Sequence, residues 1–307
     1  MKIAFFEIKE EERLFFEVHL QAHELYFFKE SIQDVVTETK EYEIVSLFVN
    51  STVTDNIIQK LPKLRYIQTR STGFDHLKCK SLYEKKIKAS NVAGYAGPAV
   101  AEFAFSLLLN ATRKTYISLH RSQSDNFNYD DLKGMELFGK TIGILGLGTI
   151  GIHMAKIARG FGMKVLGYSR TYKPMYSELG IEFITLDEVL KNADILMPAL
   201  PLTPNTKHII HSENITLLKK ECIIINVARC EIIEKSLYWS LDNLIASDVC
   251  DDKSLIHKKS FLFTPHMAYY TKEALERIMA ISLENIEVFL SGEEPPNCLK
   301  LICKKEY

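Results

Sequence analysis

Apolar and polar positions alternate along the first part of the chain in the rhythm of an α/β protein. Over residues 1–90, short apolar runs such as KIAFFEI, ELYFF and EIVSLFV are separated by charged stretches in which apolar residues recur at helical spacing. Strands that alternate with amphipathic helices are typical of a parallel sheet with helices on both faces. The pattern therefore predicts one α/β unit at the start of the chain.

The same alternation starts again at Thr141 with a stronger signal. The segment TIGILGLGTIGIHMAKIARGFGMKVLGYS combines an apolar strand, a glycine turn, an amphipathic helix and a second strand. Further strands are predicted for the runs ADILMPAL, CIIINVA, LIASDV and FLFT. Residues 98–138, between the two patterns, begin as a helix and continue as a polar loop, and residues 271–290 have the spacing of a last helix. We therefore expect two domains of similar construction.

Composition and charge narrow the range of functions. The 307 residues are 47% hydrophobic and carry a formal net charge of −1, which suits two hydrophobic cores and lacks the basic surface needed to coat nucleic acid. The most membrane-like stretch, residues 92–109, contains glycine, proline and glutamate, so no membrane span is expected. The six cysteines form no CxxC pair and the N-terminal segment soon turns acidic, which favours reduced thiols and a cytoplasmic protein. The histidine pairs His19/His23 and His208/His211 have no third ligand in register, so no metal site is expected.

A glycine pattern, GLGTIG, follows the first strand of the second unit and opens a helix. In such a loop the first glycine permits a tight turn, the second lets backbone N–H groups approach a pyrophosphate, and the third allows close packing of the helix. A glycine-rich turn without a ligand is the alternative, but the strands on both sides favour a dinucleotide site. The expected cofactor-binding residues of this loop are Gly146, Gly148, Thr149, Ile150 and Gly151.

The strand after this helix ends without the acidic residue typical of NAD-dependent enzymes. An Asp or Glu about 20 residues beyond the glycine loop commonly binds the adenosine ribose, whereas this chain has Tyr168, Ser169, Arg170 and Thr171. Ser169 adds no charge that would repel a 2′-phosphate, and the guanidinium of Arg170 matches phosphate geometry. We therefore predict NADP(H) as the preferred cofactor, with Ser169 and Arg170 among its ligands. A solvated loop arginine, with NAD(H) as the cofactor, is the alternative.

Four further motifs carry a resemblance that spans the chain. They are RSTGFDH at residues 70–76, NVAGYAGPAVAEFA at 91–104, INVAR at 225–229 and TPHMAYYT at 264–271. With the glycine loop they resemble the D-isomer-specific 2-hydroxyacid dehydrogenases, and RSTGFDH and HMAYYT are closest in wording to the D-lactate dehydrogenase branch. The resemblance implies a homodimer of an α/β fold in which a Rossmann-type dinucleotide-binding domain, residues 98–270, is inserted into a flavodoxin-like substrate domain, residues 1–97 and 271–307.

The resemblance also implies roles for individual residues. Arg229 would bind the carboxylate of a 2-keto acid and polarise its carbonyl, and His266 would donate a proton as hydride arrives from the nicotinamide. This agrees with the chemistry, because reduction builds negative charge on the carbonyl oxygen. The implied substrate contacts are the backbone N–H groups of Thr72 and Gly73 and the side chains of Tyr95 and Tyr269. The implied further cofactor contacts are Leu200, Pro201, Thr206, Val227, Ala228 and Asp248.

The chain departs from the family pattern close to these residues. Lys253 stands where the family carries a glutamate that pairs with the catalytic histidine. A carboxylate beside an imidazole favours its charged form, whereas a nearby ammonium lowers its pKa, so we expect either Asp251 or Asp252 to take the role. Cys230 replaces the usual glycine after the arginine. A small residue in a tight turn is the simpler interpretation of Cys230, and a reactive thiol is the alternative.

These observations predict a reductase of small 2-keto acids that binds no nucleic acid. The alternative from another class is a nucleotide-sensing regulatory protein with weak turnover, motivated by Lys253. Cofactor binding without consumption across a panel of keto acids would favour that alternative. Oxidation of another donor, of phosphonate or formate type, on the same fold is a third option.

Overall fold

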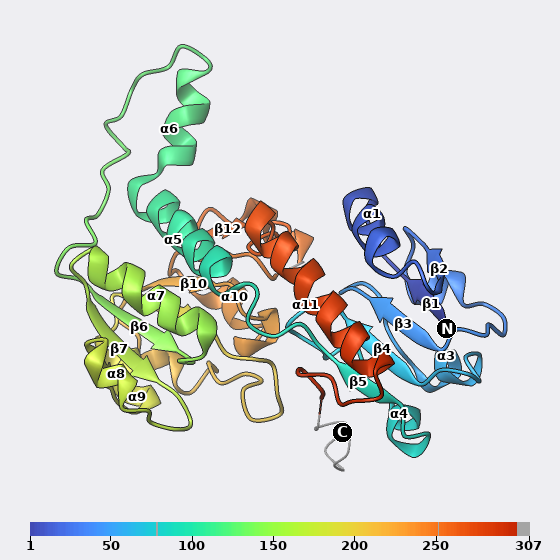
Figure 1. Cartoon of the computed structure of the whole chain (residues 1–307). Helices are drawn as coiled ribbons and strands as arrows, with labels where there is room; N and C mark the ends of the chain where they lie inside the picture. Colours follow the sequence, from blue (N-terminus) through green and yellow to red (C-terminus); the bar gives the residue numbers. More distant parts are fainter. Residues whose placement is uncertain (78, 251, 300–307) are drawn as a thin grey trace. The chain divides into compact units, whose positions relative to one another are not determined.

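The computed structural model describes residues 1–77, 79–250 and 252–299. The chain forms two compact units: an outer unit, Met1–Tyr95 with Thr271–Tyr307, and an inserted unit, Ala96–Tyr270. The predicted fold class is confirmed, because the chain leaves the outer unit, builds a complete second α/β domain and then returns (Figure 1). The first crossing lies two residues before the predicted one.

The outer unit is a parallel sheet with helices on both faces. Its strands are β1 (Lys2–Phe5), β2 (Glu24–Phe27), β3 (Ile44–Leu47), β4 (Tyr66–Thr69) and β5 (Lys88–Ser90), and its helices are α1 (Glu10–His19), α2 (Ile32–Val35), α3 (Asp55–Gln59), α4 (Lys80–Glu84) and α11 (Lys272–Leu290). In the described residues the strand order is β2-β1-β3-β4-β5, with every pairing parallel. This is the flavodoxin-like order.

The central strands β3 and β4 are buried along their whole length, because two cores lie on opposite faces of one sheet. Side chains alternate between the faces of a strand. Ile3 of β1 joins Phe16 of α1 and Ile286 of α11 in one core. The next residue, Ala4, joins Ile32 of α2 in the other. Helix α11 therefore completes the outer unit, although it follows the inserted unit in the sequence (Figure 1).

The inserted unit is a larger parallel sheet. Its strands are β6 (Thr141–Leu145), β7 (Lys164–Tyr168), β8 (Ile181–Phe183), β9 (Ile195–Pro198), β10 (Ile223–Asn226), β11 (Ile245–Ser247) and β12 (Phe261–Phe263). Its helices are α5 (Gly97–Arg113), α6 (Thr115–Ser122), α7 (Thr149–Gly160), α8 (Met175–Glu178), α9 (Leu186–Asn192) and α10 (Leu237–Ser240), with 3-10 turns η1 (Ile215–Leu217), η2 (Cys230–Ile232) and η3 (Lys253–His257). Over the described residues the order is β12-β11-β10-β9-β6-β7-β8, all parallel.

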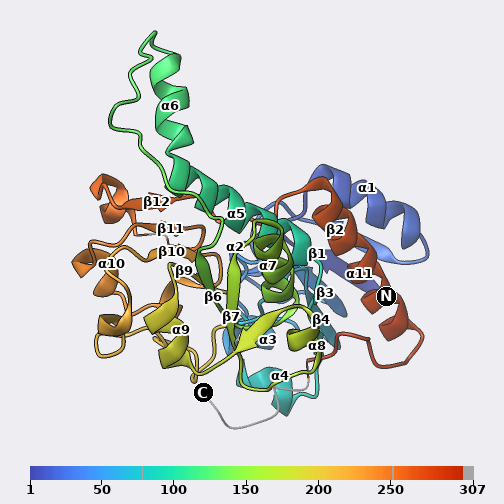
Figure 2. The same cartoon turned by 90° about the vertical axis from the view of Figure 1, so that its left-hand side faces the viewer.

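This strand order locates the place where a ligand is expected. The chain starts at β6, extends through β7 to β8, and then crosses to β9 on the other side of β6 (Figure 2). In open parallel sheets, ligands bind beyond the carboxyl ends of the strands where the order reverses. The glycine loop, the Arg170 segment and the loops of Arg229 and His266 all follow carboxyl ends of this sheet.

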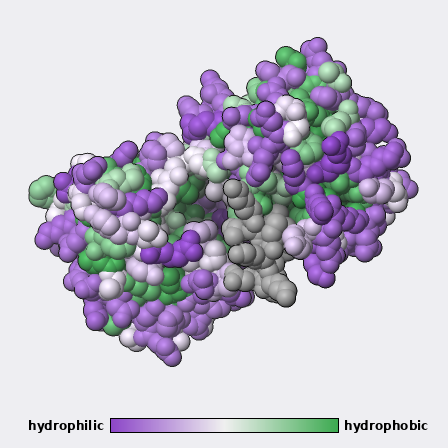
Figure 3. Space-filling model, turned by 60° about the horizontal axis from the view of Figure 1, so that its bottom comes forward, coloured by the Kyte–Doolittle hydropathy of each residue, from purple (hydrophilic) through white to green (hydrophobic). Residues whose placement is uncertain are grey.

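The helix predicted at the start of residues 98–138 corresponds to α5, and a second helix, which was not predicted, follows it. Helix α5 ends at Arg113, Lys114 adopts a left-handed backbone with φ 51°, and α6 follows it (Figures 1 and 2). On the face drawn in Figure 3, hydrophilic side chains predominate and hydrophobic ones form smaller patches. None of the helices in the described residues has the length and apolar character that crossing a membrane requires.

Candidate active site

Each glycine of the loop after β6 meets a different steric demand. Gly146 has φ +101°, and a Cβ there would lie 2.6 Å from the carbonyl oxygen of Ala199. A Cβ on Gly151 would lie 2.0 Å from the carbonyl oxygen of Gly146, so a side chain there would separate helix α7 from the loop. A Cβ on Gly148 would meet nothing within 4 Å. The loop is therefore tightly packed at Gly146 and Gly151, whereas the space beside Gly148 is open.

The open side of this loop presents hydrogen-bond donors. Gly148 is the N-cap of α7, and no side chain caps the helix. The first N–H groups of a helix have no intrahelical partner, and together with the helix dipole they favour an anion. Thr149 is exposed and Ile150 half-buried at this end of the helix. The residues present therefore fit the pyrophosphate of a dinucleotide.

The end of β7 carries positive charge and no carboxylate. Ser169 is half-buried and Arg170 is exposed. The ion pairs among the described residues do not include Arg170 or Lys173. Arg170 and Lys173 are therefore two cations, three positions apart, that could bind the 2′-phosphate of a cofactor.

The segment after β9 is a turn closed by a threonine hydroxyl. Thr206 Oγ1 donates to the carbonyl oxygen of Pro201 at 2.5 Å and accepts from the backbone N–H of Thr203 at 2.8 Å. Leu200, at the start of this turn, is half-buried. Hydroxyl bonds of this kind fix the backbone of a short loop, so the predicted cofactor residues here belong to a defined turn.

Arg229 follows β10 in a loop held by a buried asparagine. The side chain of Asn226 is fully buried, accepts from the backbone N–H of Ala228 at 3.0 Å and donates to the carbonyl oxygen of Arg229 at 2.9 Å. Asn226 also donates to the Tyr238 hydroxyl, which in turn donates to the carbonyl oxygen of Cys230 at 3.1 Å. Arg229 itself donates from Nη1 to the carbonyl oxygen of Ala228 at 2.8 Å. Neither Asn226 nor Tyr238 was among the predicted site residues, although a single polar residue at the end of the apolar run Ile-Ile-Ile-Asn indicates a buried polar group.

His266 lies in a loop that a buried carboxylate holds in place. Asp248, which follows β11, is only 1% exposed. Its oxygens accept from Thr264 Oγ1 at 2.5 Å, from the backbone N–H of Met267 at 2.9 Å and from that of Ala268 at 2.8 Å. His266 has φ +54°, a conformation that costs energy for a residue with a side chain. The three bonds to Asp248 help to maintain this conformation. The cofactor contact of Asp248, which the family resemblance places at the nicotinamide carboxamide, stays a prediction.

Of the two acidic residues predicted as partners of His266, the structure describes one. Asp251 lies outside the described residues. Asp252 accepts from the backbone N–H and the hydroxyl of Ser254, and these bonds, with Lys235 Nζ at 3.5 Å, lower its pKa. The carboxylate of Asp252 thus contacts Ser254 and Lys235. A role for Asp252 beside the histidine stays a prediction without support from its contacts.

The outer unit has a turn after β4 whose backbone N–H groups include two without a partner among the described residues. Thr72 Oγ1 donates to the carbonyl oxygen of Val92 at 3.1 Å, and Asn91 Nδ2 donates to that of Thr72 at 2.7 Å. The hydroxyl of Ser71 donates to the carbonyl oxygen of Gly73 at 2.7 Å. Among the described residues, the backbone N–H groups of Thr72 and Gly73 donate to no other residue. The turn is thus fixed by its carbonyl groups while two N–H groups stay available for an anion.

The two predicted pocket tyrosines belong to different units. Tyr95, in the outer unit, is 5% exposed, and its carbonyl oxygen accepts from Arg277 Nε at 2.8 Å. Tyr269, in the inserted unit, is half-buried and packs edge-on against Tyr270 with ring centroids 6.0 Å apart.

Val227 and Ala228, two further predicted cofactor contacts, are both buried just before Arg229. No group of three metal-ligating side chains occurs in the part of the chain that the structure describes.

Comparisons with known proteins agree with this geometry. The family model described as the NAD binding domain of D-isomer specific 2-hydroxyacid dehydrogenases matches residues 105–268. D-3-phosphoglycerate dehydrogenase of Methanocaldococcus jannaschii is 33% identical over 284 residues, which are 88% of this chain and 54% of that protein. The chain thus spans about half the length of that relative.

Solved structures extend the similarity over nearly the whole chain. D-lactate dehydrogenase from Aquifex aeolicus, complexed with NAD and lactic acid, has a TM-score of 0.87 at 28% identity and covers 95% of this chain and 96% of its own. An acyclic imino acid reductase in complex with NADPH and D-Arg has a TM-score of 0.86 at 25% identity, covering 97% and 100%. The two folds match in both units, and the bound cofactors of these proteins are NAD in one case and NADPH in the other.

Proposed function

The chain belongs to the D-isomer specific 2-hydroxyacid dehydrogenases, and on this premise we propose that it reduces small 2-keto acids to D-2-hydroxy acids with NADPH as its preferred reductant. The observation that carries the proposal is the arrangement of β10, β11 and β12, which are neighbours in one sheet. The loops of Arg229 and His266 follow the outer two of these strands, and each is held by a buried polar side chain.

The chemistry assigns a separate task to each residue. Reduction of a keto acid builds negative charge on the carbonyl oxygen, which a fixed cation and a proton donor stabilise. Arg229 is the cation and attracts the anionic substrate, and His266 delivers the proton to the oxygen. The bound dinucleotide supplies the hydride. In the outer unit, the N–H groups of Thr72 and Gly73 are the proposed donors to the substrate carboxylate.

A keto-acid panel tests the reaction directly. Oxidation of NADPH and NADH is followed with pyruvate, glyoxylate, hydroxypyruvate, phenylpyruvate and oxaloacetate, and the product is resolved on a chiral column. We expect consumption of NADPH with at least one of these acids and a D-configured product. Tight binding of the dinucleotide with no consumption on any acid would instead support the nucleotide-sensing alternative.

The NADPH preference rests on Arg170, which has no carboxylate partner among the described residues. A guanidinium contacting a 2′-phosphate stabilises it by a charge-assisted bond worth about 1.5–3 kcal/mol, or roughly tenfold to a hundredfold in affinity. Arg170→Gln should therefore raise the KM for NADPH by that factor and leave the KM for NADH unchanged. Lys164→Gln, an exposed cation at the opposite end of β7, is the control. Equal use of NADH and NADPH by the unaltered chain would contradict the preference.

The proposed oligomer is a homodimer formed through the α6 region. Large apolar side chains of α6 and the loop after it are exposed, among them Leu119 at 66% and Tyr129 at 77%. Such exposure in a monomer favours association. Light scattering after size exclusion should give twice the chain mass, and Leu119→Asp should shift the population towards the monomer. A monomeric unaltered chain at micromolar concentration would overturn the assignment.

A further inference from the structure

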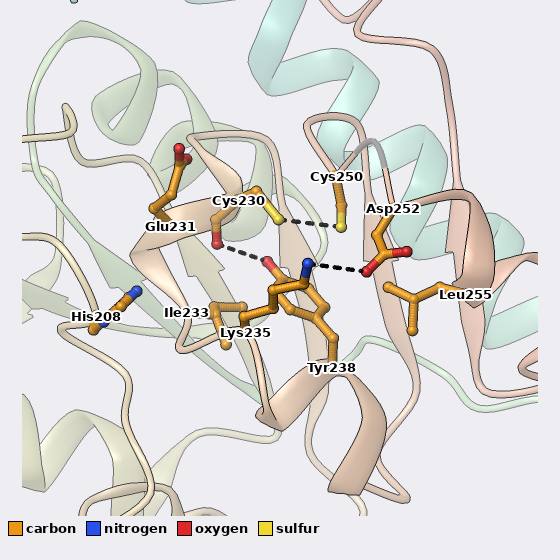
Figure 4. A pocket seen from close by; sticks show the side chains of 9 residues that line it. All are labelled: His208, Cys230, Glu231, Ile233, Lys235, Tyr238, Cys250, Asp252 and Leu255. Atoms are coloured by element: carbon orange, nitrogen blue, oxygen red, sulfur yellow. Dashed lines mark hydrogen bonds and ion pairs between the residues drawn. The ribbon is translucent and has the colours of Figure 1, made fainter.

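Two thiols meet beside the Arg229 loop. Cys230 directly follows Arg229, and Cys250 lies two residues after Asp248. They are close because β10 and β11 are paired in parallel, with Asn226 opposite Ser247, so that their following loops leave the sheet side by side. The Sγ atoms are 3.1 Å apart and share a hydrogen bond (Figure 4). A disulfide bond has a length of about 2.05 Å, so roughly 1 Å of movement separates the two thiols from a covalent link.

A cavity gives small molecules access to this thiol pair. Both cysteines line a cavity of about 180 Å³, together with Tyr238, Lys235 and Asp252 (Figure 4). A water molecule occupies about 30 Å³ in the liquid, so the cavity has room for hydrogen peroxide. Cys230 is partly exposed, whereas Cys250 is only 6% exposed. Cys230 is therefore the thiol that an oxidant reaches first.

We propose that Cys230 and Cys250 are a reversible oxidation site that forms a disulfide with hydrogen peroxide and thereby switches off the activity. The switching part rests on the proposed function, whereas the disulfide itself does not. The Cys230 thiolate attacks one peroxide oxygen and becomes a sulfenic acid as hydroxide leaves. The Cys250 thiol then attacks the sulfenic sulfur and water leaves. In total, one peroxide is reduced to two waters and two thiols are oxidised to one disulfide.

Closing the disulfide affects Arg229 through the backbone. The carbonyl oxygens of Arg229 and Cys230 are held at 2.9 Å by Asn226 and at 3.1 Å by Tyr238. A pull of roughly 1 Å on Cys230 strains both bonds and displaces the guanidinium of its neighbour. Misplacing a catalytic group by about 1 Å can reduce the rate by about 100-fold. Oxidation should accordingly lower kcat/KM for the keto acid by a factor between ten and a hundred.

The surroundings of the pair make the oxidation slow at neutral pH. The hydrogen bond with Cys250 and burial raise the pKa of Cys230, with the charge of Glu231 adding to the rise. The cavity also contains Lys235, His208, Asp252 and the hydroxyl of Tyr238. Because the thiolate is the reactive species, the rate should increase with pH. The pair therefore responds to sustained rather than brief exposure to peroxide.

The test treats the reduced full-length chain with hydrogen peroxide at alkaline pH, stops the reaction with catalase and follows three readouts. Intact mass and peptide mapping should show the loss of two hydrogens and a link between Cys230 and Cys250. The kcat/KM for the keto acid should fall at least tenfold and recover with dithiothreitol. The emission of Trp239, the single tryptophan of the chain, should change because it adjoins Tyr238.

Variants separate this site from the other thiols. Cys250→Ser should keep the basal activity and lose all three responses, and Cys230→Ser should lose the mass response, while the matched control Cys298→Ser should respond like the unaltered chain. Sulfinic or sulfonic adducts without a disulfide would overturn the site. A disulfide that leaves kcat/KM and Trp239 emission unchanged would overturn the switch. If no keto acid is reduced before oxidation, the proposed function fails, while mass and emission still decide the disulfide and the displacement.

Discussion

The two units are parallel α/β sheets that differ in how they use an arginine beyond the carboxyl ends of their strands. In the outer unit this arginine is buried within the protein. The Arg70 side chain is fully buried, and its Nη2 donates to the carbonyl oxygens of Phe6 and Glu7 at 2.9 and 3.1 Å. Its Nη1 donates to Ser46 Oγ at 3.2 Å and its Nε pairs with Glu12 at 3.3 Å.

In the inserted unit the loop after the first strand is open instead. Gly148 has no side chain and faces space in which a Cβ would meet nothing within 4 Å. Arg70 is buried, which lowers its pKa, and the charge of Glu12 opposes this shift. Arg170, in contrast, is exposed to solvent. An arginine beyond the carboxyl ends of such a sheet can therefore serve internal stability, as Arg70 does, or stay exposed, as Arg170 does.

The largest expected effect comes from removing the internal cation. Arg70→Met leaves two carbonyl oxygens and Glu12 without their partner, and breaking a buried ion pair from one side costs about 3–5 kcal/mol. Hydrogen exchange in peptides from β1 and β4 should accelerate strongly, whereas peptides from β6 and β10 should not change. The exposed Arg13→Met is the control, because surface pairs contribute about 0–1 kcal/mol. Uniform acceleration in both units would contradict the comparison.

The reverse experiment fills the open edge. Gly148→Asp places a carboxylate where the pyrophosphate is expected, and like charges about 4 Å apart repel by about 4 kcal/mol at an effective dielectric constant of 20. The Kd for NADPH, measured by its fluorescence, should rise at least 100-fold. The unfolding midpoint without cofactor should stay the same, since the site has space. Gly148→Ala is the matched uncharged control, and equal weakening by Ala and Asp would show that charge is not the cause.

A smaller effect is expected where the inserted unit supports its own site. Asp248→Asn replaces one acceptor oxygen by an NH₂ group that faces backbone N–H donors, and an unsatisfied buried group costs about 1–3 kcal/mol. The His266 loop should loosen, so that kcat/KM for the keto acid falls about tenfold while the Kd for NADPH changes less. Asp130→Asn, on an exposed loop, is the control. An equal loss in NADPH affinity would instead support the predicted nicotinamide contact.

The elements and the glycine loop could be predicted from the sequence because their signals are local. The runs KIAFFEI and TIGILGLGTIG contain the strand period and the turn residues in one stretch. Helix α6 was missed, because nothing in the sequence indicates that a second helix follows the left-handed Lys114.

The supports of the site could not be predicted, since they join distant segments. Asp248 holds a loop 19 and 20 residues away, and Arg70 contacts Phe6 across 64 positions. Either Asp251 or Asp252 was expected beside His266 because Lys253 occupies the position of the family glutamate, and this expectation stays a prediction. The cap that the Asp252 carboxylate forms on the η3 turn gave no signal in the sequence. The hydrogen-bond partner of an acidic side chain depends on three-dimensional packing, which cannot be read from the spacing or the composition of the sequence.

The smallest effect is expected from Asp55, a carboxylate that, like Arg70, makes its hydrogen bonds within the outer unit. Asp55 Oδ1 accepts from the Cys79 thiol at 3.0 Å, from the backbone N–H of Ser81 at 2.8 Å and from its hydroxyl at 2.5 Å, which joins α3 to the start of α4. These bonds lower the pKa of Asp55 to about 2. Because the folded pKa lies below the usual value, the contribution to stability is complete above about pH 4 and is lost as the pH falls through about 2. Asp55→Asn should therefore lower the unfolding temperature slightly at pH 6, and the difference from the unaltered chain should vanish towards pH 2. A difference that is constant over this range would show that the amide loses packing rather than charge, and Asp130→Asn should show none at any pH.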